Sequence, residues 1–150
     1  MQLKQIGIIH SPYKTLIDVP SSTLIENDVV CEIELFSEYE EGLLDVEQAS
    51  HLVILYWLDK ADRNVLQGIT SIDHKNHGVF VTRSPHRPNP IAISVVRLIE
   101  RKGNILKIGD ITALEGTPLL DIKPYIAKTD LILGTEVEWI DKIKDFNIQK

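Results

Sequence analysis

The sequence predicts a mostly β protein, a single small antiparallel β-barrel with one or two short helices. Several short segments alternate apolar and polar side chains, as half-buried strands do. Turn-forming Gly, Pro, Asn and Asp residues separate these segments at short intervals. Only residues 38–50 show helical spacing, and Gly42 weakens that pattern. Together these observations favour an antiparallel barrel or sandwich around one core.

The first half of the chain contains three predicted strands. Residues 4–10 form the first, and a long loop without periodicity follows over residues 14–27. Residues 29–35 alternate as a half-buried strand, and residues 38–50 are expected to be helical with a solvated acidic face. Residues 52–58 are apolar on both faces, which indicates a strand in the middle of the barrel wall.

The second half begins with a polar stretch, residues 61–77, which predicts one short turn of helix and a loop. A hairpin turn is expected at residues 101–104. Strands are predicted over residues 78–81, 91–100, 105–113, 119–125 and 134–140.

Length and composition indicate one barrel domain over residues 1–140 and a polar tail over residues 141–150. Cys31 is the single cysteine, which excludes an internal disulfide, and its apolar strand setting favours a core position over a nucleophile. The longest apolar run, residues 52–58, is too short to cross a membrane, and residues 1–5 do not resemble a signal peptide. We therefore expect a cytoplasmic protein with no membrane partner.

The formal net charge of −6 is unevenly distributed along the chain. Residues 28–62 are strongly acidic, whereas residues 78–125 carry seven basic and four acidic side chains. A local positive face is therefore possible, because local potential rather than net charge steers an anionic ligand.

A rigid loop is predicted at residues 82–90, where three prolines fall within six residues. Each proline fixes its own φ and extends the residue before it, so this segment cannot be helical. Such a loop presents Arg83, His86, Arg87 and Asn89 at fixed positions, which favours binding of an anionic or planar ligand. A proline-stiffened turn with solvated charges is the alternative.

Asp121, Lys123 and Tyr125 occupy alternate positions, so an extended chain places their side chains on one face. The carboxylate could accept a proton while the ammonium or the phenol holds a polar substrate. A simple surface ion pair between Asp121 and Lys123 is the alternative.

Two classes of site find little support in the sequence. His74 and His77 lie three residues apart without a carboxylate at ligand spacing, so we expect two exposed loop histidines and no metal site. A metal hydrolase that uses some of the five histidines stays open as a minor alternative. The absence of any Gly-x-Gly sequence leaves a Rossmann nucleotide fold without support.

Four ordered motifs together resemble the TsaA-like family. They are Ile6-Gly7-Ile8-Ile9-His10-Ser11-Pro12-Tyr13, Ser50-His51-Leu52, the stretch from Gly78 to Ile91, and the stretch from Glu115 to Tyr125. Characterised members are S-adenosylmethionine-dependent tRNA methyltransferases that act on N6 of threonylcarbamoyladenosine next to the anticodon. The resemblance implies a small β-barrel without a Rossmann fold, working as a homodimer that binds the cofactor near the subunit interface.

By position, the resemblance also implies roles for individual residues. The expected cofactor-binding residues are Ser22, Thr23, Leu24, Leu58, Asp59, Arg83, Ile93, Gly116, Thr117 and Pro118. Asp121, Lys123 and Tyr125 are the expected catalytic residues, with Asp121 or Tyr125 as the base. Arg83, His86, Arg87 and Asn89 are the expected substrate-binding residues, and the anticodon loop of tRNA is the expected partner.

One departure from the family pattern concerns the proline-rich motif. His86 stands where the motif commonly has phenylalanine, so the ring can both stack and carry a charge. The alternative function is a noncatalytic β-barrel that binds an adenine ligand or RNA and regulates another process.

Overall fold

The structure, a computed structural model, describes residues 1–20 and 28–143. The chain divides into two compact units, which we describe separately. The first unit comprises Met1–Asp59 and Ile91–Tyr125, and the second comprises Lys60–Pro90 and Ile126–Lys150. The domain boundary predicted after residue 140 stays a prediction.

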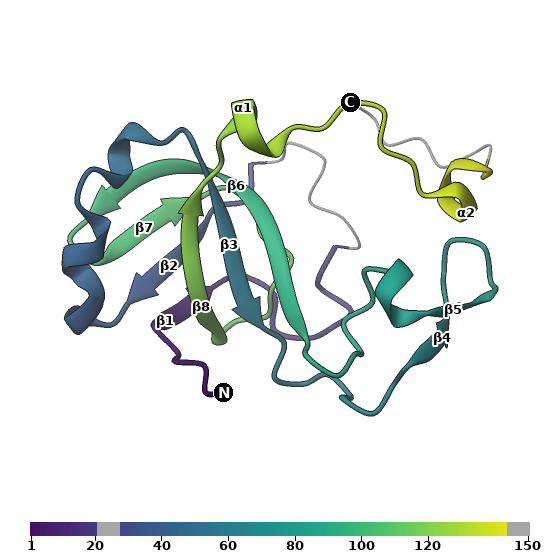
Figure 1. Ribbon diagram of the computed structural model, residues 1–150. Helices are drawn as coiled ribbons and strands as arrows, with labels where there is room; N and C mark the ends of the chain where they lie inside the picture. The colour runs from purple at the N-terminus through teal and green to yellow at the C-terminus, as the bar shows by residue number, and fades with distance from the viewer. Residues whose placement is uncertain (21–27, 144–150) are drawn as a thin grey trace. The chain divides into compact units, whose positions relative to one another are not determined.

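The first unit is a closed barrel in which every strand pairs antiparallel with its neighbours (Figure 1). Around the barrel the order is β1-β2-β7-β6-β3-β8, so the first and last strands in the sequence meet and close the ring. The strands are β1 (Gly7–His10), β2 (Cys31–Leu35), β3 (His51–Trp57), β6 (Ile91–Lys102), β7 (Ile105–Ile108) and β8 (Thr117–Pro124). The predicted mostly β class and barrel architecture are confirmed.

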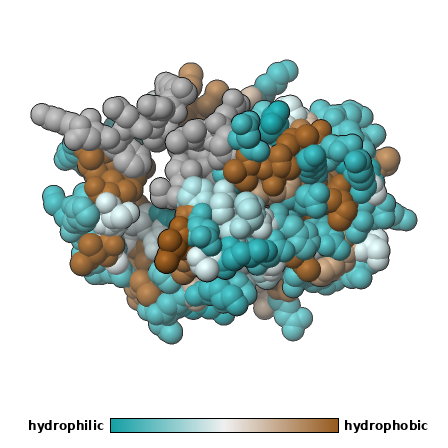
Figure 2. Space-filling view, turned by 180° about the vertical axis from the view of Figure 1, so that it is seen from behind, coloured by the Kyte–Doolittle hydropathy of each residue, from teal (hydrophilic) through white to brown (hydrophobic). Residues whose placement is uncertain are grey.

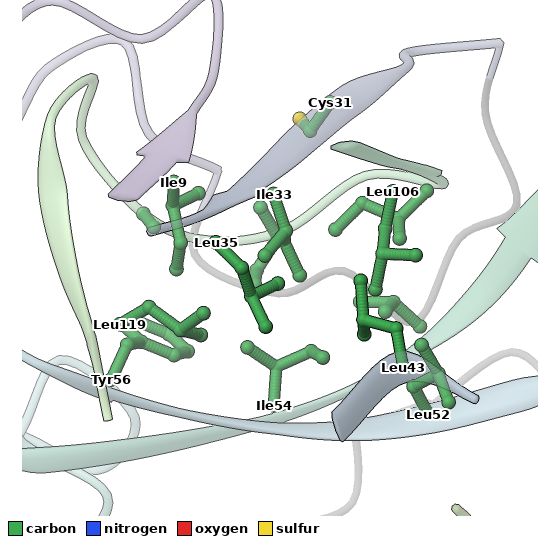
Figure 3. Packing of buried hydrophobic residues seen from close by; sticks show 14 residues of the cluster. Ile9, Cys31, Ile33, Leu35, Leu43, Leu52, Ile54, Tyr56, Leu106 and Leu119 are labelled. Atoms are coloured by element: carbon green, nitrogen blue, oxygen red, sulfur yellow. The ribbon is translucent and has the colours of Figure 1, made fainter. Parts of the chain in front are cut away.

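Alternate residues of these strands fill the barrel interior. Ile9, Ile33, Ile54, Leu106 and Leu119 are completely buried and come from five different strands. Figure 3 shows Ile9, Ile33 and Leu119 among the packed side chains. Burial of large aliphatic groups is the main favourable term in folding, so this cluster holds the wall in place.

Cys31 belongs to the same core, as the sequence predicted, and is 2% exposed. Burial raises the pKa of its thiol to about 11. A buried thiol that stays protonated at neutral pH is a poor nucleophile, which leaves Cys31 a packing role.

Closure of the barrel depends on a glycine in β1. Gly7 pairs with Leu35 of β2 on one side and with Leu119 of β8 on the other. A Cβ atom at Gly7 would lie 2.2 Å from the backbone oxygen of Glu34. No side chain fits there, so this close approach of β1 to β2 requires glycine.

The predicted helix at residues 38–50 is replaced by two 3-10 helices, η1 (Ser37–Leu43) and η2 (Val46–Gln48). Asp45 adopts a left-handed backbone with φ 65° and interrupts the helical path between them. Only Leu43 is buried in these two helices, so packing does not stabilise a longer regular helix.

In the second unit, two predictions for residues 61–81 are wrong. The polar stretch forms a two-stranded antiparallel sheet of β4 (Gln67–Ile69) and β5 (Asn76–Gly78) rather than a turn of helix. The predicted strand at residues 78–81 is instead a 3-10 helix, η3 (Val79–Val81). Phe80 in η3 is 84% exposed, so its apolar character does not reflect a buried strand.

The predicted last strand, residues 134–140, is also wrong. The region contains the short helices α1 (Ala127–Asp130) and α2 (Glu138–Asp141), with Gly134 at φ 72° between them. Trp139 donates its indole N–H to the carbonyl of Val81 at 3.1 Å and stacks on His77 with a ring separation of 4.2 Å. Contacts within this unit thus replace the strand pairing that the alternation predicted.

Among the described residues, no helix has the length and apolar character needed to cross a membrane. Apolar side chains nevertheless reach the surface, and Figure 2 shows hydrophobic patches between hydrophilic residues on one face.

Candidate active site

The barrel wall made by β6, β3 and β8 has an outward surface rich in apolar side chains. Leu52, Ile54 and Tyr56 of β3 are buried, so the residues between them point outwards. We call this surface the outer face; it consists of Val53, Leu55, Trp57, Ile91, Ile93, Val95, Asp121 and Lys123. Ile91, Ile93 and Val95 of β6 therefore point out of the barrel, whereas Ser94 and Val96 face inwards.

A β-bulge in β8 places Asp121 on the outer face. Leu119 pairs with Tyr56 and is completely buried, and the register then shifts so that Asp121 pairs with Leu55. Without the extra residue, strict alternation from Leu119 would point Asp121 into the core. The bulge therefore keeps a carboxylate out of the hydrophobic interior.

Asp121 and Lys123 form an ion pair on this face, with 2.6 Å between Oδ2 and Nζ. The side chains are 43% and 59% exposed, respectively. Asp121 Oδ1 also accepts the backbone N–H of Ile122 at 2.9 Å. The carboxylate is thus fixed in position, yet it remains open to solvent and to a ligand.

Strand register brings Asp121 close to a predicted cofactor-binding residue. Leu55 pairs with Ile93 of β6 on one side and with Asp121 of β8 on the other. Two strand spacings separate Ile93 from Asp121, about 10 Å between backbones. A ligand that lies across Leu55 can therefore touch both an exposed apolar side chain and a carboxylate.

Other predicted cofactor-binding residues have evident folding roles. Gly116 has φ 81° and donates its N–H to Ile9 O at 2.9 Å. The buried Thr117 hydroxyl donates to Leu114 O at 2.7 Å, and Leu58 packs partly against the core. Their cofactor roles, and those of Asp59 and Pro118, stay predictions. Ser22, Thr23 and Leu24 lie outside the described residues.

Arg87 organises the proline-rich loop from inside. Its guanidinium donates to the carbonyls of Val79, Thr82 and Ser84 at 2.8, 2.6 and 2.9 Å. These hydrogen bonds hold the start of the loop in the geometry that the prolines favour. The structure therefore gives Arg87 a positioning role, and its predicted contact with substrate stays a prediction.

The far end of the loop is tied to the segment that follows Lys60. His86 Nδ1 accepts the backbone N–H of Asp62 at 2.9 Å, and Arg63 Nε donates to Pro88 O at 2.9 Å. A phenylalanine at position 86 could not accept this hydrogen bond. Arg83 and Asn89 are exposed on the loop, which suits their predicted binding roles.

Arg83 belongs to the second unit and Asp121 to the first. The predicted roles of Arg83 in binding the cofactor and the substrate stay predictions.

Sequence reasoning missed a polar cluster around His10 in the first unit. Nδ1 lies 2.8 Å from Glu115 Oε1 and Nε2 lies 2.7 Å from Glu34 Oε2, and Glu115 also accepts the N–H of Ser11 at 2.7 Å. Hydrogen bonds from Glu115 and Glu34 raise the pKa of His10. Burial opposes ionisation of Glu115, but the hydrogen bonds from His10 and Ser11 hold its pKa below the ordinary value. Glu115 is 105 positions from His10, so no local spacing could reveal the pair.

The expectation of two exposed loop histidines is wrong for His77. Its Nε2 lies 2.9 Å from Asp73 Oδ2, and the side chain is only 16% exposed. His74 is exposed, with φ 58°. In the part of the chain that the structure describes, no group of three or more His, Cys, Asp or Glu side chains could hold a metal ion.

Residues 8–131 match the family model described as "tRNA-methyltransferase O N-terminal domain". The chain belongs to this family. The TsaA-like resemblance expected from the four motifs is thereby confirmed.

Two curated proteins resemble the chain over most of its length. A protein of Archaeoglobus fulgidus named "Probable S-adenosyl-L-methionine-binding protein" is 46% identical over 142 residues, which cover 95% of this chain and 38% of that protein. The Escherichia coli "tRNA (adenine(37)-N6)-methyltransferase" is 36% identical over 135 residues, 83% of this chain and 57% of that protein.

A crystal structure of TrmO from Pseudomonas aeruginosa matches with a TM-score of 0.79 and 31% identity, covering 94% of this chain and 63% of that one. The chain thus spans between 38% and 63% of the length of these three proteins.

Proposed function

We propose that this chain is an S-adenosylmethionine-dependent methyltransferase that acts on N6 of threonylcarbamoyladenosine next to the tRNA anticodon. The observation that carries the proposal is the row Ile93–Leu55–Asp121 on the outer face, in a chain of the tRNA-methyltransferase O family. The printed names of the relatives supply the cofactor and the tRNA adenine. With tRNA as substrate, we expect the activity in the cytoplasm.

The outer face suits a ligand that combines a purine with a positive charge. Leu55 and the half-exposed Ile93 offer apolar surface for a ring, and Asp121 carries the charge opposite to a sulfonium. The family resemblance assigns cofactor binding to Leu58, Asp59, Ile93 and Arg83. The guanidinium of Arg83 would pair with the carboxylate of the cofactor. When bound, S-adenosylmethionine supplies an electrophilic methyl group.

The chemical task of the chain is to remove one proton and to fix the geometry of transfer. The carbamoyl group on N6 delocalises the nitrogen lone pair and makes the N6 proton more acidic than that of an amine. Asp121, or Tyr125 as phenolate, accepts this proton, which leaves an electron pair on N6. That pair would form the new N–C bond as the S–CH3 bond of the sulfonium breaks, with the bonding electrons left on sulfur and S-adenosylhomocysteine as the leaving group. Orientation of N6 by the site supplies most of the remaining acceleration.

In this proposal Lys123 binds the carboxylate of the threonyl group. Its ammonium already forms an ion pair with the Asp121 carboxylate at 2.6 Å. The substrate carboxylate would pair with the same positive charge. Exposed residues of the proline-rich loop, Arg83, His86 and Asn89, supply contacts to the tRNA.

A homodimer is part of the proposal. Ile91, Ile93 and Val95 are 41%, 46% and 48% exposed in a row along β6. Contiguous exposed apolar side chains favour an interface, because burial in a second subunit removes them from water. We expect a dimer in light scattering and a monomer for the Val95→Glu variant; a wild-type monomer at micromolar concentration would contradict this.

Calorimetry with S-adenosylmethionine, followed by methyl transfer to tRNA with and without threonylcarbamoyladenosine, tests the function. We expect cofactor binding and transfer to the modified tRNA only. Binding without transfer would instead support a noncatalytic regulator, the reading that the names of several relatives as binding proteins also permit.

A further inference from the structure

A row of three polar side chains, Arg97, His51 and Tyr125, borders the outer face. His51 of β3 pairs with Arg97 of β6, and the backbone N–H of Tyr125 donates to His51 O at 3.0 Å. Directly opposite residues of paired strands project from the same face, which applies to His51 and Arg97. Tyr125 directly follows β8, and its hydrogen bond to His51 continues the pairing of that strand with β3. The row lies two residues along β3 and β6 from Val53 and Val95, next to Lys123 of β8.

The side chain of Arg97 can bind an anion from outside the barrel. It is exposed, and within the described residues its side chain makes no hydrogen bond or ion pair. On its other side lies Gly109, whose N–H donates to Arg97 O at 3.0 Å and which has no side chain to cover the guanidinium. An exposed arginine flanked by a glycine and a histidine is open to a bidentate anion.

The neighbours of Arg97 add donors to the same place. The Ser50 hydroxyl lies 3.0 Å from His51 Nδ1; when it donates there, the ring proton is on Nε2, which is then a donor. The Tyr125 hydroxyl offers a further donor. Across three strands the row is about 10 Å wide. Arginine, histidine and tyrosine donors in a line are suited to successive phosphates of a nucleic-acid backbone.

We propose that Arg97, His51 and Tyr125 bind the phosphate backbone of the tRNA and direct the modified base towards Asp121. This inference rests on the proposed function for the identity of the nucleic acid. In this arrangement Asp121 is the base and Tyr125 keeps its proton as a phosphate donor. Tyr125 thereby joins the phosphate row, Arg97, His51 and Tyr125, to the catalytic edge, since Lys123 and Asp121 lie on the same face.

Binding of tRNA to the full chain, measured across a range of salt concentrations, tests the row. Counterion release predicts that Arg97→Ala weakens binding about five- to eightfold at 0.1 M salt and lowers the slope of log affinity against log salt by about one. Arg97→Lys should retain most of the slope. Affinity for S-adenosylmethionine should not change.

Lys102→Ala is the matched control, because it removes one positive charge from the C-terminal end of the strand whose middle carries Arg97. The inference is overturned if Arg97→Ala and Lys102→Ala have the same tRNA affinity and salt slope, or if the wild-type chain binds no tRNA. Wild-type binding without methyl transfer, with the Arg97 effect intact, would refute the proposed function and support the phosphate row.

Discussion

Replacement of Asp121 by asparagine separates a catalytic role from a structural one. The change removes the charge but keeps the size and an acceptor for the Ile122 N–H. The ion pair with Lys123 is substantially exposed, so its loss costs about 1 kcal/mol of folding free energy or less. Native domains are stable by about 5–15 kcal/mol, so the variant should remain folded.

The expected increase in activation free energy is larger than the expected loss of folding free energy. A general base contributes about 10²- to 10⁴-fold, which corresponds to about 3–5 kcal/mol of activation free energy. The assay is single-turnover transfer of a labelled methyl group to threonylcarbamoylated tRNA, with cofactor and enzyme saturating. Under these conditions binding defects do not limit the observed rate.

Glu100→Gln provides the control for this experiment. Glu100 pairs with Lys102 at 3.4 Å on β6 and its side chain is 46% exposed, so it is a comparable carboxylate–lysine pair outside the outer face. We expect Glu100→Gln to transfer the methyl group at the wild-type rate. If Asp121→Asn also did so, Asp121 would not be the base, and Tyr125→Phe would then be the variant expected to lose activity.

Three further substitutions have predicted outcomes. His10→Gln should lower the free energy of unfolding by about 1 kcal/mol. Because the pKa of His10 is raised and that of Glu115 is lowered, this difference should be greatest between about pH 4.5 and 6.5 and fade above the raised His10 pKa; a pH-independent difference in denaturant titrations would contradict it. Arg87→Met, which loses three hydrogen bonds to loop carbonyls, should make residues 79–88 exchange amide hydrogens faster, and unchanged exchange would contradict its positioning role. Gly7→Ala should lower the melting temperature by several degrees because its Cβ meets Glu34 O, and an unchanged melting temperature would show that β1 can shift freely.

The barrel strands could be predicted because their alternation reflects burial on one side. In β2 the apolar residues at alternate positions are those that fill the core, whereas β3 was predicted from an uninterrupted apolar run. In β6 the same kind of alternation is inverted, since Ile93 and Val95 point outwards while Ser94 is buried and bonds to the Tyr56 hydroxyl at 2.9 Å. The alternation of apolar and polar residues predicts that a strand forms. Which of its two faces points into the core depends here on a buried hydrogen-bond partner elsewhere in the chain.

The failures of prediction share a different cause. Residues 78–81 and 134–140 contain apolar side chains that no sheet pairs with, and local contacts decide their structure instead. Trp139 stacks on His77 and bonds to Val81 O, partners more than 50 positions away that a local pattern cannot reveal. The same holds for the bulge before Asp121, which depends on the register against β3.

The candidate site was predicted in part. The spacing of Asp121 and Lys123 was enough to place both side chains on one face. The resemblance supplied Ile93, which the register places on the same face across Leu55. The positioning role of Arg87 was not foreseen, because its carbonyl partners become visible only when the loop is folded.

A crystal structure of the chain with S-adenosylmethionine tests the proposed site most directly. We expect the cofactor to lie across Leu55 and Ile93 on the outer face, with its methyl carbon directed towards Asp121 and Tyr125. A cofactor bound to another surface, with the methyl group remote from both of these side chains, would contradict the proposed active site.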